Sequence, residues 1–181
     1  MDKKDIKITI YCAGLIIVMS IWLIICTAEL SAFTLLKTAL LIVFSYIAML
    51  FDINTKRIPN SLVLLMIAGW LLLIMSTIFS DLNISFRLLV DSTYGLLIGG
   101  GLFLLVYIIS KKGLGGGDVK FMAAAGLYLG FSKTTQAILY GTVLAALTGL
   151  VLIVLKKIGR KDTMPLAPFL FIGIMITVFT A

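Results

Sequence analysis

The chain has 181 residues, of which 61% are apolar and only 13% are charged, and its formal net charge is +7. Soluble domains carry about 25% charged residues, so this composition excludes an ordinary soluble protein and indicates an integral membrane protein. The sequence has no histidine, which excludes Ser-His-Asp and Cys-His catalysis and histidine-ligated metal sites and leaves acid-base chemistry to carboxylates, lysine or tyrosine.

Apolar stretches long enough to form membrane-spanning helices recur along the whole chain. A spanning helix needs about 20 apolar residues, or about 17 at the short end. Seven spans are predicted, at 7–28, 32–51, 61–79, 89–110, 118–133, 135–155 and 164–181. The fifth is short, so it is expected either to start below the membrane surface or to cross incompletely. We therefore predict an all-α polytopic bundle that forms one transmembrane domain over residues 1–181.

The placement of lysine and arginine indicates how this bundle sits in the membrane, because both residues favour the cytoplasmic side of a span. With the N-terminus in the cytoplasm, twelve of the fifteen fall in cytoplasmic segments and three, Lys37, Arg87 and Lys133, fall outside. The net charge is thus a topology signal and an attraction to the anionic lipid of the inner leaflet. It is not a nucleic-acid footprint, since aromatic residues do not interleave with the basic ones.

Two features of the span interiors are assigned structural roles. Small residues recur at a spacing of four, which lets helices approach closely; they are Gly95 and Gly99, Gly126 and Gly130, and Gly141, Ala145 and Gly149. Asp91 opens the predicted fourth span on the outer side, where an ion pair or a helix N-terminal position explains it.

Two of the eight acidic residues have positions that indicate function. Asp52 ends the second predicted span and Asp118 begins the fifth, so both are expected at the cytoplasmic edge of the bundle. A carboxylate at the membrane boundary is costly and commonly functional, although an acid paired with Lys56 or Lys120 would explain either residue alone. Two neighbouring carboxylates titrate as a pair. In aspartic proteolysis the ionised member activates water and the protonated member polarises the scissile carbonyl.

The stretch KKGLGGGDVKF, residues 111–121, places Gly115, Gly116 and Gly117 directly before Asp118. Glycine lets another backbone approach closely, so an extended substrate could lie beside Asp118. Exposed N–H groups at a helix N-terminus would also keep a carboxylate ionised or hold a developing oxyanion. The alternative is a phosphate-cradling loop, but the G-x-x-x-x-G-K-[ST] pattern is absent.

Two proline-containing segments are expected on the same side of the membrane. In DINTKRIPN, Pro59 opens the next helix or ends an extended segment, which holds Asp52 on a stiff connector. In MPLAPFL, Pro165 and Pro168 are expected to loosen the first turn of the last span and to free backbone groups that line a cavity. Ordinary helix initiation is the alternative for this second pair.

Together these stretches resemble the signature of the type IV prepilin peptidases, membrane aspartic proteases that process prepilins and archaeal preflagellins. Asp52 with IPN at 58–60 resembles the family's first aspartate and the Ile-Pro-Asn that follows it. GGGDVK at 115–120 resembles the G-x-G-D motif, including a lysine that is typical of bacterial members. MPLAPFLFIG at 164–173 resembles the Pro-Phe-Gly-Pro-Phe-Leu stretch, with Ala167 where glycine is common.

The resemblance covers about residues 32–181 and leaves residues 1–31 as an extra N-terminal span. It implies that Asp52 and Asp118 form the catalytic pair, with the acid and base roles unassigned. It also implies that the enzyme cuts a short basic leader from a prepilin-like or preflagellin-like protein at the cytoplasmic face of the cell membrane. The residues that would shape the substrate path or position the pair are Gly115, Gly116, Gly117, Lys120, Pro59, Asn60, Pro165 and Pro168.

No cofactor or metal is expected. Longer bacterial members of the family carry a cytoplasmic insert with paired cysteines and a methyltransferase activity. Here the first loop is short, and Cys12 and Cys26 form no C-x-x-C pair, so we predict a peptidase without methylation. Two alternatives stay open. Presenilin-type relatives share G-x-G-D but lack the Ile-Pro-Asn element, and a small ion or proton-coupled transporter would use the same two acids to bind a cation.

Overall fold

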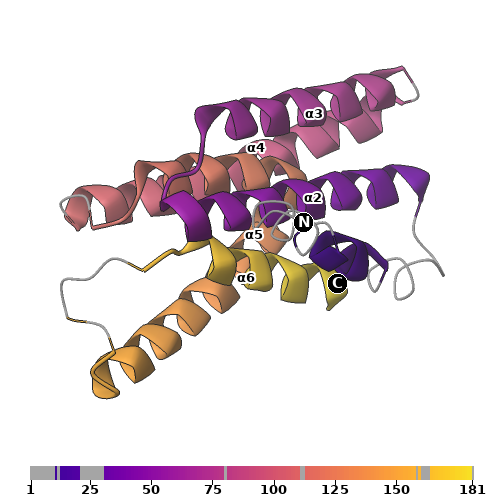
Figure 1. Ribbon diagram of the computed structural model, residues 1–181. Helices are drawn as coiled ribbons and strands as arrows, with labels where there is room; N and C mark the ends of the chain where they lie inside the picture. The colour runs from indigo at the N-terminus through magenta and orange to yellow at the C-terminus, as the bar shows by residue number, and fades with distance from the viewer. Residues whose placement is uncertain are drawn as a thin grey trace.

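The computed structural model describes residues 11, 13–20, 31–79, 81–110, 113–157, 159 and 164–180. Over these residues the regular secondary structure is helical throughout, which confirms the predicted all-α class. The helices are α2 (Ala32–Thr55), α3 (Asn60–Ile78), α4 (Leu82–Ile109), α5 (Gly116–Val154) and α6 (Ala167–Phe179), packed as a bundle (Figure 1). Residues 13–20 are also helical, whereas Cys12 and Cys26 lie outside the described residues.

The outer surface of the bundle is apolar. Helices α2, α3, α4 and α5 are each long and apolar enough to cross a membrane, and large side chains such as Leu72, Leu105 and Val154 are exposed on them. Water solvates such side chains poorly, so this exposure fits a lipid-facing surface. The chain is therefore a multi-pass membrane protein. Helix α6 is shorter, with 13 residues, and covers only part of the predicted seventh span.

Helix α5 consists of two halves that meet at Gly130, where the backbone has φ 74° and ψ −176°. Gly95 of α4 lies against Gly126 and Gly130 of α5, and Gly99, one turn further along α4, lies against Met122 and Thr134. Along α4, contacts with the first half of α5 thus run backwards in sequence, and contacts with the second half run forwards. The two halves therefore run in opposite directions along α4 and correspond to the predicted fifth and sixth spans. The reversal comes at Gly130, earlier than the predicted boundary. As predicted, the first half is short: residues 116–129 extend about 21 Å, against about 30 Å for the bilayer core.

The outer end of α4 differs from the prediction. Asp81 caps the N-terminus of α4 through its side chain, so the helix begins well before the predicted 89–110 span. Polar residues in these roughly two extra turns hid them from a count of apolar residues. Asp91 consequently lies inside α4 instead of at its start, and its Oδ1 accepts a hydrogen bond from the N–H of Phe131 at 3.0 Å. Asp91 does sit at a helix N-terminus, but that helix is the second half of α5.

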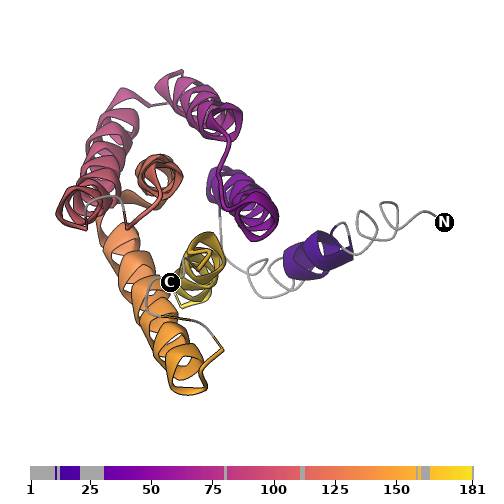
Figure 2. The same cartoon turned by 60° about the vertical axis from the view of Figure 1, so that its left-hand side comes forward.

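The first half of α5 forms the centre of the bundle, surrounded by α2, α3, α4 and α6 (Figure 2). Phe121 and Tyr128 are almost completely buried there, and the Tyr128 hydroxyl donates to the carbonyl oxygen of Met66 in α3 at 2.6 Å. A Cβ atom on Gly95 would collide with the carbonyl oxygen of Gly126. The predicted close approach of helices at small residues is thus confirmed for this pair.

The helical residues 13–20 pack against α2 and α6. Tyr46 of α2 makes an edge contact with Phe171 of α6, and its hydroxyl donates to the carbonyl oxygen of Tyr11 at 3.0 Å. The apolar side chains that cover this aromatic pair from the N-terminal segment are Leu15, Val18 and Met19. The division of the chain into an extra span and a core stays a prediction.

Candidate active site

One end of the bundle, at the left in Figure 1, brings together the C-terminus of α2 and the N-termini of α5 and α6. Asp52 lies in the last turn of α2, and Asp118 lies in the first turn of α5. Both carboxylates are buried, with the residues only 5% and 8% exposed. The two acids selected from the sequence therefore occupy the same end of the molecule on adjacent helices.

Asp52 is held at both its backbone and its side chain. Its carbonyl oxygen accepts a hydrogen bond from the N–H of Lys56 at 2.8 Å. Lys56 ends α2 in the left-handed conformation, with φ 52°. The Oδ2 atom of Asp52 accepts a hydrogen bond from the backbone N–H of Ala167 at 2.9 Å. Because Ala167 is the first residue of α6, the N-terminus of that helix points at the carboxylate.

Asp118 has fewer polar contacts. Its backbone N–H donates to the carbonyl oxygen of Gly115 at 3.1 Å, which closes the first turn of α5. Its Oδ1 atom is buried and has no hydrogen-bond partner in the described part of the chain. The two carboxylates are close enough for their charges to interact, but no hydrogen bond joins them among the described residues. A water molecule or a substrate carbonyl could therefore lie between them.

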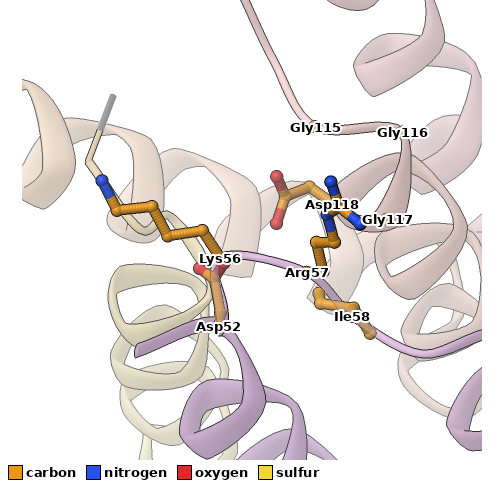
Figure 3. A pocket seen from close by; sticks show the side chains of 8 residues that line it. All are labelled: Asp52, Lys56, Arg57, Ile58, Gly115, Gly116, Gly117 and Asp118. Carbon is orange, nitrogen blue, oxygen red and sulfur yellow. The ribbon is translucent and has the colours of Figure 1, made fainter. Parts of the chain in front are cut away.

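Both carboxylates line one pocket of about 350 Å³. Figure 3 shows Asp52 and Asp118 entering it from different helices, with the α2–α3 connector along one side and the glycine stretch along another. The residues that line the pocket are Asp52, Lys56, Arg57, Ile58, Gly115, Gly116, Gly117 and Asp118. It contains two acids, two cations and backbone from three glycines, a set suited to proton transfer at a peptide group.

The three glycines differ in how tightly they are enclosed. A Cβ atom on Gly115 would lie 2.8 Å from Oδ2 of Asp118, and one on Gly117 would lie 3.2 Å from both the Cβ and the backbone nitrogen of Ile58. At Gly116 the nearest atom, on Tyr107, would be 4.0 Å away. Gly115 and Gly117 thus leave room for the Asp118 carboxylate and for the α2–α3 connector. Gly116 lines the pocket without such a constraint.

The connector that follows Asp52 is tied to the helix that carries Asp118. Pro59 has an extended backbone and precedes the first residue of α3, Asn60, as the sequence predicted. The Nζ atom of Lys120 donates to Oδ1 of Asn60 at 2.9 Å. Since Lys120 is two residues beyond Asp118 on α5, this hydrogen bond links the two sides of the pocket.

The last two selected residues lie beside the pocket but do not line it. Pro168 stands in the first turn of α6, next to Ala167, and Pro165 precedes that helix. Two contributors to the site were not predicted from the sequence: the backbone of Ala167 as a partner of Asp52, and Arg57 as a pocket residue. Arg57 could have been found, because it lies between Asp52 and Pro59. Within the described ranges no cluster of three His, Cys, Asp or Glu residues could hold a metal ion.

The chain resembles known proteins over the part that carries both acids. The model of the type IV leader peptidase family matches residues 39–154. Three relatives, each named prepilin leader peptidase/N-methyltransferase, come from Legionella pneumophila, Escherichia coli and Pectobacterium carotovorum. They are 31%, 29% and 34% identical over 144, 170 and 143 residues. These matches cover 78%, 85% and 74% of this chain and 49%, 71% and 47% of the relatives.

The chain thus spans about half the length of most of these relatives. No solved structure matches it significantly. The family model covers α3, α4, α5 and most of α2, and so includes Asp52, the α2–α3 connector, the three glycines and Asp118. On this match the chain belongs to the type IV leader peptidase family.

Proposed function

We propose that this protein is an aspartic endopeptidase in which Asp52 and Asp118 act as a coupled pair. The observation that carries the proposal is the burial of two carboxylates on one pocket, in a chain that has eight acids and no histidine. One ionised carboxylate can take a proton from water while the protonated one donates to the scissile carbonyl. Neither step needs a metal or a cofactor.

The proposed substrate is a prepilin-like or preflagellin-like protein with a short basic leader, cut at the cytoplasmic face of the cell membrane. Membership of the family and the printed names of the relatives support this choice. The position of the pocket also supports it, because the pocket lies where α2 ends and α5 begins. A bond at the start of a hydrophobic substrate helix would reach the same depth.

Contacts around the pocket support the proposed positioning roles. A side chain at Gly115 would crowd the Asp118 carboxylate, and one at Gly117 would crowd Ile58 of the connector, so glycine would keep both in place. Gly116 would border the path of the substrate. Lys120, Asn60 and Pro59 would hold the connector against α5. Pro165 and Pro168 would shape the start of α6, next to the donor that Asp52 uses.

A transporter finds no support in the comparisons, and the packing disfavours it. An ion path would have to continue from the two acids through the bundle. Beyond the pocket the centre of the bundle is filled by the side chains of Phe121, Met122 and Tyr128, all almost completely buried. The pocket therefore fits a reaction at the membrane edge better than passage across it.

Coexpression with a pilin-like protein tests the proposal. The substrate needs a short basic leader followed by a hydrophobic helix, and mass spectrometry of its N-terminus reports the cut. We expect a product shortened by the leader, formed by the wild-type chain and not by a double Asp52→Asn, Asp118→Asn variant. An uncut substrate beside a folded, membrane-inserted wild-type chain contradicts the proposal. Ion flux through liposomes without any cleavage would instead support the transporter.

Substitution of two neighbouring glycines checks the geometry of the pocket. Gly117→Ala places a methyl group 3.2 Å from Ile58, so the connector has to shift relative to α5 by a few tenths of an ångström. We expect kcat to fall, but by less than the ~100-fold that a displacement of ~1 Å at a catalytic site can cost. Gly116→Ala adds the same methyl group into open space and should cost much less. Steady-state cleavage by the two purified variants measures the difference. Equal losses would show that the contact with Ile58 is unimportant.

A further inference from the structure

The N-terminus of α6 offers an unusual set of backbone donors to Asp52. Residues 165–168 read Pro-Leu-Ala-Pro, and the two prolines have no N–H group. Only Leu166 and Ala167 can donate in this segment. The N–H of Ala167 donates to Oδ2 of Asp52 at 2.9 Å, and the N–H of Leu166 interacts with the same carboxylate. Both available donors are thus directed at one acid, and the prolines leave no unsatisfied donor beside it.

Asp118 has fewer donors than Asp52. It is buried, and its Oδ1 has no hydrogen-bond partner in the described part of the chain. The N–H of Gly115 interacts with the Asp118 carboxylate, one backbone donor against the two at Asp52. With a buried oxygen left unsatisfied, the ionised form costs more free energy at Asp118 than the carboxylic acid does. The α5 N-terminus contributes a favourable field at Asp118, but no donor reaches this oxygen in the described structure.

One charged group beside Asp52, Lys56, favours the same distribution. Lys56 ends the helix of Asp52 and interacts with that carboxylate electrostatically. Arg57 lines the pocket that both acids share, so it does not distinguish between them. Asp118 faces Asp52 from α5, and the described part of α6 brings only backbone donors. Lys120 of α5 donates a hydrogen bond to Asn60 at the start of α3.

We propose that the N-terminus of α6 is a positioning element that holds the shared negative charge on Asp52 and leaves the shared proton on Asp118. The proposal rests on the proposed peptidase function. In the first step Asp52 takes a proton from water as the water oxygen bonds to the scissile carbon, and Asp118 gives its proton to the carbonyl oxygen. In the second step the C–N bond breaks, Asp52 protonates the leaving nitrogen, and Asp118 recovers a proton from one hydroxyl of the diol.

Removal of the Ala167 N–H tests this assignment through the pH profile of kcat/KM. The cleanest change is lactate in place of Ala167, which turns the Leu166–Ala167 amide into an ester and keeps the methyl group. Ala167→Pro is the genetic counterpart, since proline is tolerated at the first position of a helix. Ala167→Val is the matched control, because it adds similar volume and keeps the N–H.

The direction of the shift identifies which acid carries the charge. A donor to the carboxylate favours its ionised form, so its loss should move the acidic limb to higher pH by about one unit, equivalent to about 1.4 kcal/mol. The basic limb should stay in place, because Asp52 is ionised on both sides of it. The lactate and proline variants should show this shift, while the valine control keeps both limbs where the wild type has them.

Three results would overturn the assignment. A shift of the basic limb instead of the acidic one would put the charge on Asp118. A fall in rate that is equal at every pH would make the α6 N-terminus a purely structural element. A valine control that shifts as much as the ester would assign the effect to packing. If the proline variant does not fold, the ester alone decides. Absence of cleavage by the wild type would refute the peptidase proposal, which is a different failure.

Discussion

Asp52→Asn and Asp118→Asn are each expected to slow cleavage of a pilin-like substrate by about 10²–10⁴-fold, the usual contribution of general acid-base catalysis. Asparagine has nearly the same shape as aspartate but cannot transfer the proton. The two acids share one pocket and one proton in the proposed mechanism. The double variant should therefore be about as slow as either single variant, because groups that act as a unit give non-additive effects.

Single-turnover cleavage by purified protein in detergent or nanodiscs measures these rates. Asp81→Asn is a suitable control, because Asp81 caps α4 away from the pocket and asparagine caps helices about as well as aspartate. It should cleave at the wild-type rate. Full activity of either Asp52→Asn or Asp118→Asn would refute the two-acid mechanism, and additive losses would indicate that the acids act independently.

Gly130→Ala is expected to destabilise the protein by about 3 kcal/mol. The φ of 74° and ψ of −176° at Gly130 are accessible essentially only to glycine, and forcing another residue there costs about 1–3 kcal/mol. A Cβ atom would also collide with the carboxylate of Asp91, which bonds to the N–H of Phe131. The substitution therefore strains the reversal and disturbs the cap of the second half of α5.

Thermal unfolding in detergent, followed by loss of helical signal, checks this effect. Gly101→Ala is the matched control, because a Cβ atom there meets nothing within 4 Å and alanine favours a helix more than glycine does. Its stability should equal or exceed that of the wild type. Adding Asp91→Ala to Gly130→Ala should recover part of the loss by removing the collision. Wild-type stability in Gly130→Ala would mean that the two halves of α5 do not require this conformation.

The position of Asp52 and Asp118 at the same end of the bundle could be predicted from the sequence, because it follows from counting the spans. Each apolar stretch crosses the bundle once, so Asp52 and Asp118 fall at the same end when the second and fifth stretches are counted correctly. That count also separated the two halves of α5. The boundary was less exact, because an apolar average locates a reversal only to within a few residues, whereas the dihedral angles of Gly130 fix it.

Other features could not be predicted, because their partners are far apart in sequence. The bond from Phe131 to Asp91 spans 40 positions, and the bond from Lys120 to Asn60 spans 60. No local pattern reports such pairs. The donor to Asp52 was hidden for another reason: it is a backbone N–H, 115 positions away, and the alanine that carries it has no polar side chain.

The short first half of α5 has a consequence for the supply of water. Hydrolysis consumes one water molecule for each bond cut, and the hydrocarbon core of a bilayer contains almost none. Residues 116–129 fall about 10 Å short of the thickness of that core. Because α2, α3, α4 and α6 surround these residues, lipid does not fill the missing length, and the start of the helix has to be hydrated through the pocket that Asp118 lines. Solvent then reaches the depth of Asp118, so hydrolysis at this pocket needs no separate water channel.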